Sequence, residues 1–304
     1  MPARLCVHLP DEPALIRILD DRAQLTLGRA ADCDLVLEHA SVSRRHAVIE
    51  HEGGDWVVRD LGSKNGVRIG GTRVTEGRLR SGQWFSVGDA FCQFDEVMPA
   101  QLEALAARTT SRRHHSEAWS ERLKMAQGAD ELFAGLITAI VELAECRRGF
   151  LLAGNPVQGL RVRACYRLDP DELRDGSFEG SSTAIERTLR ERRAIFFSNP
   201  QDQAWLGERA SVIAQGIRAL ASVPLIHEGK LLGVAYADSD EPGKAFTEID
   251  AEILTAFASQ AAVALAAASV TEALAEIESW LAVDAGSVRA LSGQSLSWDA
   301  LRTR

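Results

Sequence analysis

The chain has 304 residues, 46% of them hydrophobic and 25% charged, with a formal net charge of −9 at pH 7. This length favours two domains of ordinary size, and the composition excludes wholesale disorder. The acidic balance argues against non-specific binding of nucleic acid by the protein as a whole, while leaving room for a local basic site.

The five cysteines are scattered and no two of them form a CxxC pair: Cys6, Cys33, Cys92, Cys146 and Cys165. Their spacing is typical of a reducing cytoplasm and argues against a zinc site or a disulfide framework. The N-terminal residues MPARLCVHLPDEP contain no continuous apolar stretch, so we expect no signal peptide. The longest apolar segment, residues 253–270, is rich in alanine, and we interpret it as a packed or paired helix rather than a membrane span. We therefore expect a cytoplasmic protein with no membrane partner.

Residues 1–98 consist of short alternating runs of apolar and polar residues, separated by turns that contain glycine. The runs are LCVHL, QLTLG, CDLVL, HAVIE, WVVRDL, VRIGG and WFSVG. They recur roughly every ten residues, a spacing typical of an all-β sandwich or barrel.

Residues 99–122 lose this pattern and gather polar and basic side chains, which predicts a linker with some helical content. Two adjacent threonines, Thr109 and Thr110, suggest an autoinhibitory hypothesis in which a phosphorylated linker occupies a phosphate site of the same chain. The pair His114-His115 has a metal-binding interpretation, but a solvated basic stretch is favoured.

Residues 123–270 have the mixed periodicity of an α+β domain. Apolar residues at helical spacing between 132 and 143 predict an amphipathic helix. Strand-like runs follow at 149–153, 160–168, 194–198, 219–227 and 230–238, with helical pieces at 183–192 and 206–215. A long helix is predicted from about 247 to 283. We expect helices flanking a mainly antiparallel sheet, and we assign residues 271–304 to a C-terminal helix and a mobile tail.

Three stretches between the predicted strands of the first domain have related chemistry: LGR (27–29), SVSRRH (41–46) and GSKNG (62–66). Loops between strands can meet at one end of a sandwich. Cations and a hydroxyl hold a phosphate dianion, and an asparagine amide can bond a peptide backbone on both of its sides. The set therefore fits a phosphate carried on a peptide. Its members are Arg29, Ser43, Arg44, Arg45, Lys64 and Asn65.

Each stretch also has an ordinary interpretation. A single arginine is usually solvated, SRRH alone suits a basic surface patch, and Asn-Gly alone is a hairpin turn. A role for His46 as a catalytic base is disfavoured, because the sequence shows no nucleophile paired with it. Trp56, Trp84 and Phe85 lie in strand-like runs where core burial explains them, so no stacking platform for nucleic acid is predicted.

Gly-Arg, then Ser-x-x-His, then Asn-Gly, in this order, resembles a forkhead-associated (FHA) domain over roughly residues 4–97. The resemblance implies an eleven-stranded β-sandwich that binds phosphothreonine peptides through the loops at one end. It further implies that Arg29 and Ser43 contact the phosphate, with Arg44 and Lys64 as supporting contacts. The side chain of Asn65 would bond the peptide backbone.

The same resemblance implies structural roles for three other residues. His46 would brace the loop that presents Ser43, and Gly28 and Gly66 would permit the turns. The chain departs from the family at Gly70-Gly71, where members often have Asn-Gly, so we expect a different loop support there.

Residues 125–270 resemble a GAF domain, a small-molecule sensor module. The resemblance is carried by RRGFLLAG, ASVPLIHEGKLLGVAYADS and FTEIDAEILTAFASQAAVAL. It implies a six-stranded antiparallel sheet with helices on one face, a ligand pocket on the other, and terminal helices that pair between subunits.

The ligand signature of cyclic-nucleotide-binding members is incomplete in this chain. Lys244, Phe246 and Asp250 are kept, but Gly243 and Ala251 replace the other two residues. We interpret the segment as a helix start, with Thr247 as N-cap and Asp250 at its capping-box position.

Cys165 bears on whether a covalent chromophore can attach. It falls in the alternation of LRVRACYRL together with three arginines, so we expect its thiol to face water and to be a poor chromophore anchor.

We therefore predict a bacterial, non-enzymatic signalling protein with an N-terminal β-sandwich and a C-terminal α+β domain. Its partners would be a phosphothreonine-containing protein and the serine/threonine kinase that phosphorylates it. The second domain would sense a small ligand or support a homodimer through the long helix. No catalytic residue, metal site or resident cofactor is predicted, because P-loop, GxSxG and HExxH motifs are missing from the sequence. The alternative is the sensory component of a transcription activator, or of a cyclase or phosphatase system, that acts through a separate output chain.

Overall fold

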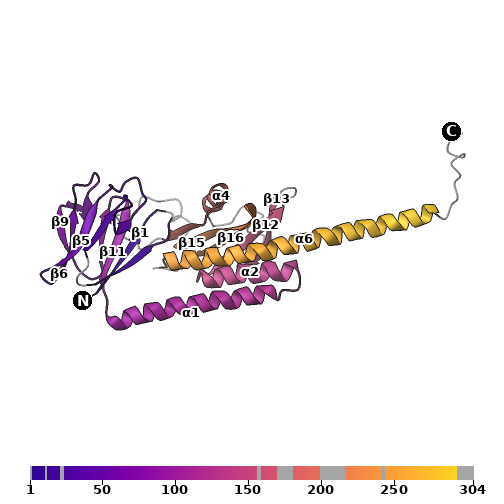
Figure 1. Ribbon diagram of the computed structural model, residues 1–304, viewed down its shortest axis with the longest axis horizontal. Helices are drawn as coiled ribbons and strands as arrows, with labels where there is room; N and C mark the ends of the chain where they lie inside the picture. Colours follow the sequence, from indigo (N-terminus) through magenta and orange to yellow (C-terminus); the bar gives the residue numbers. More distant parts are fainter. Residues whose placement is uncertain are drawn as a thin grey trace.

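The computed structural model describes residues 2–10, 12–20, 24–155, 159–169, 181–198, 217–241 and 244–292. A β-sandwich is followed by a long helix and then by an α+β domain, from which the last helix extends (Figure 1). The helical piece predicted at 206–215 and residues 293–304 of the predicted tail lie outside the described residues, whereas residues 284–292, also assigned to the tail, continue the last helix.

The sandwich is built from two sheets. One has the strand order β2-β1-β11-β10-β7-β8 and the other β4-β3-β5-β6-β9. Their facing side chains form a core that includes Ile49, Trp56, Phe85 and Phe94. The strands are β1 (Ala3–His8), β2 (Leu15–Leu19), β3 (Gln24–Gly28), β4 (Leu35–Val36), β5 (Ala47–Glu52), β6 (Asp55–Asp60), β7 (Val67–Ile69), β8 (Thr72–Val74), β9 (Glu76–Leu79), β10 (Gln83–Val87) and β11 (Ala90–Glu96).

One end of the sandwich collects several connections. At this end of the larger sheet His8 pairs with Phe91, and Val87 pairs with Val67. Because the strands are antiparallel, the same end carries the β10–β11 turn, the β6–β7 loop and the β1–β2 connection at residues 9–14. This end holds both the candidate site and a contact with the second domain.

Residues 99–122, predicted to be a linker with some helical content, lie entirely in helix α1 (Pro99–Lys124). Proline at the first helical position is compatible with a helix start, because its missing N–H would have no partner there. Trp119 and Leu123 are buried in the core of the second domain, so α1 packs along that domain (Figure 1). The hydroxyls of Thr109 and Thr110 donate to helix carbonyls one turn earlier.

The second domain has a five-stranded antiparallel sheet in the described residues, with the order β13-β12-β16-β15-β14. Helices α1, α2 and α6 cover one face and α4 covers the other (Figure 1). The predicted apolar face of the first amphipathic helix is buried, as expected. The elements are α2 (Ala129–Leu143), β12 (Arg148–Asn155), β13 (Gly159–Tyr166), α4 (Ser182–Glu191), β14 (Ile195–Ser198), β15 (Ala219–His227), β16 (Lys230–Ser239) and α6 (Glu248–Ser292).

The expected exposure of Cys165 is wrong, and a β-bulge explains why. Leu151 pairs with Ala164 and Leu152 with Val162, so Arg163 is an extra residue that shifts the alternation of β13. Cys165 therefore packs against the apolar cluster beneath α4. Burial raises the pKa of its thiol.

Helix α6 continues well past the sheet (Figure 1). Its segment Glu248–Ala268 is long and apolar enough to span a membrane by length and composition, with a mean hydropathy of 1.5. Several of its side chains, including Leu254, Phe257 and Leu265, belong to the core of the second domain. Val263 and Val270 are more than half exposed, at 53% and 60%.

Candidate functional site

The three loop stretches identified in the sequence meet at one end of the sandwich. The backbone N–H of Arg29 donates to the carbonyl of Ser43 (2.9 Å), which joins the β3–β4 and β4–β5 loops. Asn65 Nδ2 donates to the carbonyl of Ser41 (2.7 Å), and the N–H of Lys64 donates to Ser43 Oγ (3.1 Å). These bonds hold Arg29, Ser43, Lys64 and Asn65 on adjacent loops.

His46 is fully buried between two of these loops. Its Nδ1 accepts a hydrogen bond from the N–H of Ser43 (3.1 Å), so the other nitrogen, Nε2, carries the proton and donates to the carbonyl of Gly66 (3.2 Å). Burial lowers the pKa of His46, which keeps the ring neutral. With both nitrogens engaged, the ring braces the β4–β5 loop against the β6–β7 loop and is not available as a catalytic base.

The β10–β11 turn supports the same loops from the other side. The N–H of Asp89 donates to Ser41 Oγ (2.8 Å), and His39 Nδ1 lies 2.8 Å from the same oxygen. The N–H of Gly88 donates to the carbonyl of Gly66 (3.4 Å). These hydrogen bonds attach the candidate loops directly to the end of the larger sheet.

The glycines of the site fit their positions for steric reasons. A Cβ on Gly28 would fall against the carbonyl oxygen of Arg44, so only glycine allows this close approach. Gly66 has φ +78°, a left-handed conformation that favours glycine. Gly70 and Gly71, where the sequence departs from the FHA pattern, form the β7–β8 turn with φ +56° and +83°.

Sequence reasoning missed further supports of the β6–β7 loop. The N–H of Ser63 donates to Asp60 Oδ1 (2.9 Å), and Ser63 Oγ accepts from the N–H of Gly66 (2.9 Å). Arg73 of β8 donates to the carbonyl of Ser63 (3.1 Å). The spacing of Asp60 and Ser63 is a signal of a side-chain turn that could have been read, whereas nothing in the sequence marks Arg73.

The cations of the site are exposed. Across the residues that the structure describes, no carboxylate forms an ion pair with Arg29, Arg44 or Lys64, and Ser43 is only half-buried. Elsewhere on the same sandwich Arg59 pairs with three carboxylates, those of Glu50, Glu52 and Glu76. The site therefore presents guanidinium, ammonium and hydroxyl donors toward solvent, a combination suited to a phosphate dianion.

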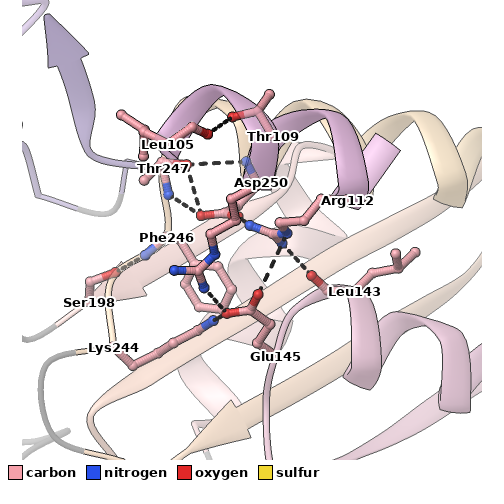
Figure 2. Close-up of polar contacts among 11 residues, drawn as sticks. Leu105, Thr109, Arg112, Leu143, Glu145, Ser198, Lys244, Phe246, Thr247 and Asp250 are labelled. Atoms are coloured by element: carbon pink, nitrogen blue, oxygen red, sulfur yellow. Dashed lines mark hydrogen bonds and ion pairs between the residues drawn. The ribbon is translucent and has the colours of Figure 1, made fainter. Parts of the chain in front are cut away.

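A second polar cluster lies where α6 begins (Figure 2). The N–H of Thr247 donates to Asp250 Oδ2 (2.6 Å) and that of Asp250 donates to Thr247 Oγ1 (3.4 Å), which confirms the predicted capping box. Arg112 of α1 forms an ion pair with Asp250 and also donates to the carbonyl of Leu143 at the end of α2. Three helices are thus joined at one buried point.

The residues that resemble a ligand signature take structural positions in this cluster. Lys244 Nζ lies 3.2 Å from Glu145, and burial lowers the pKa of this lysine. Phe246 is fully buried against Phe196, with ring centroids 5.5 Å apart. Gly243 lies outside the described residues.

The sheet face beneath α4 is filled by apolar side chains in the described residues. Tyr236 is buried there, and its hydroxyl accepts a hydrogen bond from the N–H of Ser181 (3.1 Å). Residues 170–180 and 199–216, which flank this region in sequence, lie outside the description. No cluster of three potential metal ligands occurs in the described ranges, and His114-His115 lies on α1.

Comparison with known families identifies a domain in each of the two folded regions of the chain. Residues 25–88 match the family model of the FHA domain, and residues 128–265 match that of the GAF domain. The chain carries an FHA domain followed by a GAF domain. The candidate loops belong to the FHA domain, and the buried cluster of Figure 2 belongs largely to the GAF domain and α1.

Similar proteins are matched through the FHA domain. The transcriptional regulatory protein EmbR of Mycobacterium tuberculosis is 39% identical over 82 residues, which are 27% of this chain and 20% of EmbR. The glycogen accumulation regulator GarA of Mycolicibacterium smegmatis is 38% identical over 72 residues, which are 24% of this chain and 46% of GarA. The matches therefore cover between a fifth and about half of these relatives.

Solved structures match the same part of the chain. M. tuberculosis EmbR in complex with a low-affinity phosphopeptide is 32% identical, covering 31% of this chain and 24% of that one, with a TM-score of 0.27. The FHA domain of CT664 from Chlamydia trachomatis is 26% identical, covering 32% of this chain and all of that one, with a TM-score of 0.30.

Proposed function

We propose that the protein is a cytoplasmic signalling adaptor whose FHA domain binds a phosphothreonine-containing segment of a partner protein. FHA and GAF domains are regulatory binding modules, and the relatives matched through the FHA domain are named as regulators. Arg29 and Ser43 would contact the phosphate, Arg44 and Lys64 would support them, and Asn65 would bond the peptide backbone. The phosphorylated partner and the serine/threonine kinase that modifies it complete the pathway.

The observation that carries this proposal is the set of exposed cations, unpaired within the part of the chain that the structure describes, on the loops whose backbone bonds to Ser43 bring them together. His46 and Lys64 fix the orientation of the serine from behind, while no carboxylate of the described chain neutralises Arg29. A phosphothreonine brings about −1.5 to −2 charges to such a site.

Titration of a fluorescent threonine peptide in phosphorylated and unphosphorylated forms tests the proposal. We expect binding of the phosphorylated form alone. Arg29→Ala should weaken it by about 10- to 150-fold, because a hydrogen bond to a charged group contributes about 1.5–3 kcal/mol. Arg78→Ala on β9 removes the same charge from an exposed residue outside the loops and serves as the matched control. Equal affinity for the two forms, or equal effects of the two variants, would contradict the proposal.

We also propose that the GAF domain senses a small ligand or acts as a dimerisation platform, with two copies pairing along α6. The exposed Val263 and Val270 on this helix support pairing, since large exposed apolar residues favour contact with a partner. Light scattering should give a dimer for the full chain and a monomer for Val263→Glu/Val270→Glu. A monomeric full chain would contradict the proposed pairing along α6.

The alternative function is that of a sensory component in a transcription activator, or in a cyclase or phosphatase system. One observation favours it: the relative EmbR is named a transcriptional regulator. In that case the chain would act as a sensory component and transmit its state to a separate output chain. Co-purification with a DNA-binding or catalytic partner would favour this function.

A further inference from the structure

Arg73 of β8 lies beside the β6–β7 loop, which carries two of the proposed ligand contacts. Its Nη2 donates to the carbonyl of Ser63 (3.1 Å). Its guanidinium also lies against Gly66, because a Cβ on this glycine would overlap with Arg73 Nε. Ser63 and Gly66 are the residues immediately before and after the pair Lys64-Asn65. Arg73 therefore contacts both ends of the segment that presents these two side chains.

The same segment is attached to the interior of the domain by other bonds. The N–H of Gly66 donates to the hydroxyl of the buried Ser63 (2.9 Å), and the carbonyl of Gly66 accepts from His46 Nε2 (3.2 Å). The carbonyl of Ser63 takes part in neither bond and accepts from Arg73, whose side chain is on the solvent side. Arg73 thus adds an outer attachment to a segment that His46 holds from within.

The orientation of both ligand contacts depends on where this segment lies. The N–H of Lys64 donates to Ser43 Oγ (3.1 Å), and a shift of roughly 0.5 Å would take this contact out of hydrogen-bonding range. Asn65 Nδ2 donates one hydrogen to the carbonyl of Ser41 (2.7 Å), which leaves its second amide hydrogen and Oδ1 for a peptide backbone. A displaced segment would turn these free groups away from the site.

A tight hairpin brings Arg73 to this position. The β7–β8 turn is formed by Gly70 and Gly71, both with positive φ, and it places Arg73 directly opposite Arg68. Like charges opposite each other on a sheet are unfavourable. The two guanidinium groups have different targets, since Arg68 donates to the carbonyl of Gly71 in the turn (3.4 Å) and Arg73 donates to the β6–β7 loop. Arg68 is therefore a matched reference for Arg73.

We propose that Arg73 is a positioning residue of the phosphopeptide site. It holds the carbonyl of Ser63 and packs on Gly66, and in this way it keeps the side chains of Lys64 and Asn65 oriented toward a bound peptide. The inference rests on the proposed phosphopeptide function of the FHA domain. It gives a part in binding to β8, which carries none of the residues of the three loop stretches. Arg73 acts through the loop, so its effect must depend on the side chains that the loop presents.

Fluorescence anisotropy of the full chain with a seven-residue phosphothreonine peptide tests the role of Arg73. Arg73→Met removes the donor and should weaken binding by about three- to tenfold, the scale of one lost hydrogen bond. Arg73→Lys keeps a charged donor on an unbranched stem and should bind within about twofold of the original chain. Arg68→Met removes the same charge from the opposite strand, and it should change the affinity by less than about twofold because solvent screens an exposed charge.

Combined variants show whether Arg73 acts through the loop. In Lys64→Ala/Asn65→Ala the further change Arg73→Met should weaken binding by less than about twofold, whereas in Arg29→Ala, on a different loop, its effect should keep its full size. An undiminished effect in Lys64→Ala/Asn65→Ala would overturn this inference alone. Unchanged binding of Arg73→Met, or a loss of equal size in Arg68→Met or Arg73→Lys, would do the same. Failure of the original chain to bind the seven-residue phosphopeptide would instead overturn the proposed function.

Discussion

The cations at the tip of the FHA domain are exposed and lack a carboxylate partner in the described chain, whereas those at the start of α6 are largely buried and paired. Arg112 and Lys244 have side-chain exposures of 16% and 11%, and they face Asp250 and Glu145. A buried cation requires a paired carboxylate because its desolvation is costly. An exposed cation stays hydrated and can remain unpaired until a ligand binds. The comparison separates the candidate binding site from the structural ion-pair cluster at the start of α6 on physical grounds.

The largest expected effect comes from breaking the buried ion pair between Arg112 and Asp250. Arg112→Met leaves Asp250 buried without its cation, and we expect the free energy of unfolding of the GAF domain to fall by about 3 kcal/mol. Urea unfolding measures it, and phosphopeptide affinity should remain unchanged. Arg113→Met, which breaks only an exposed pair with Glu252, is the control and should cost less than about 1 kcal/mol. Equal losses of unfolding free energy in Arg112→Met and Arg113→Met would contradict the distinction between a buried, structural ion pair and an exposed one.

The next effect is a loss of FHA stability in acid. Burial lowers the pKa of His8 to about 4 and also lowers that of His46, so the unfolded state binds protons first as the pH falls. Stability is therefore complete above the unfolded value of 6.5 and is lost below it. For His8 alone we expect about 2 kcal/mol between pH 7 and pH 5. Urea unfolding at the two pH values should show this loss, and His8→Phe should reduce it; an unchanged loss would show that His8 is not its source.

The smallest effect concerns the supporting cations of the site. Arg44→Ala and Lys64→Ala should each weaken phosphopeptide binding by about two- to fivefold, because we assign these residues supporting charge interactions that solvent screens, whereas Arg29 is assigned a direct hydrogen bond to the phosphate. Anisotropy titration with the seven-residue peptide measures this. A loss as large as that of Arg29→Ala in either variant would reassign the principal phosphate contact.

Much of the fold follows from local pattern in the sequence. Alternating runs separated by glycine turns mark most strands of the sandwich, and the strands predicted in the second domain match β12 to β16 within one or two residues. The residues of the candidate loops are recognisable because short motifs carry them in a fixed order. The capping box at Thr247 was also predictable, since it depends only on residues three apart.

What the sequence does not reveal depends on distant partners. Along its 26 residues helix α1 buries only Trp119 and Leu123, so its apolar stripe is too sparse to distinguish it from a linker. The bulge at Arg163 depends on how β13 pairs with β12. The FHA–GAF contact combines backbone bonds of Ala14, which have no side-chain signature, with the ion pairs Arg17–Glu248 and Glu12–Arg193, whose partners lie far apart in the sequence. Thr109 and Thr110 lie inside α1, so either would have to leave the helix before binding to the loops as an extended peptide.

The central claim is that the phosphothreonine segment binds at the loops that His46 braces. Titration of the full deuterated chain with the seven-residue phosphopeptide, followed by transverse-relaxation-optimised amide spectra, tests it most directly. We predict that the largest chemical-shift changes occur at Arg29, Ser43, Lys64 and Asn65, and that the unphosphorylated peptide causes none of them. Changes centred on another face of the sandwich, or identical changes with both peptides, would contradict the account.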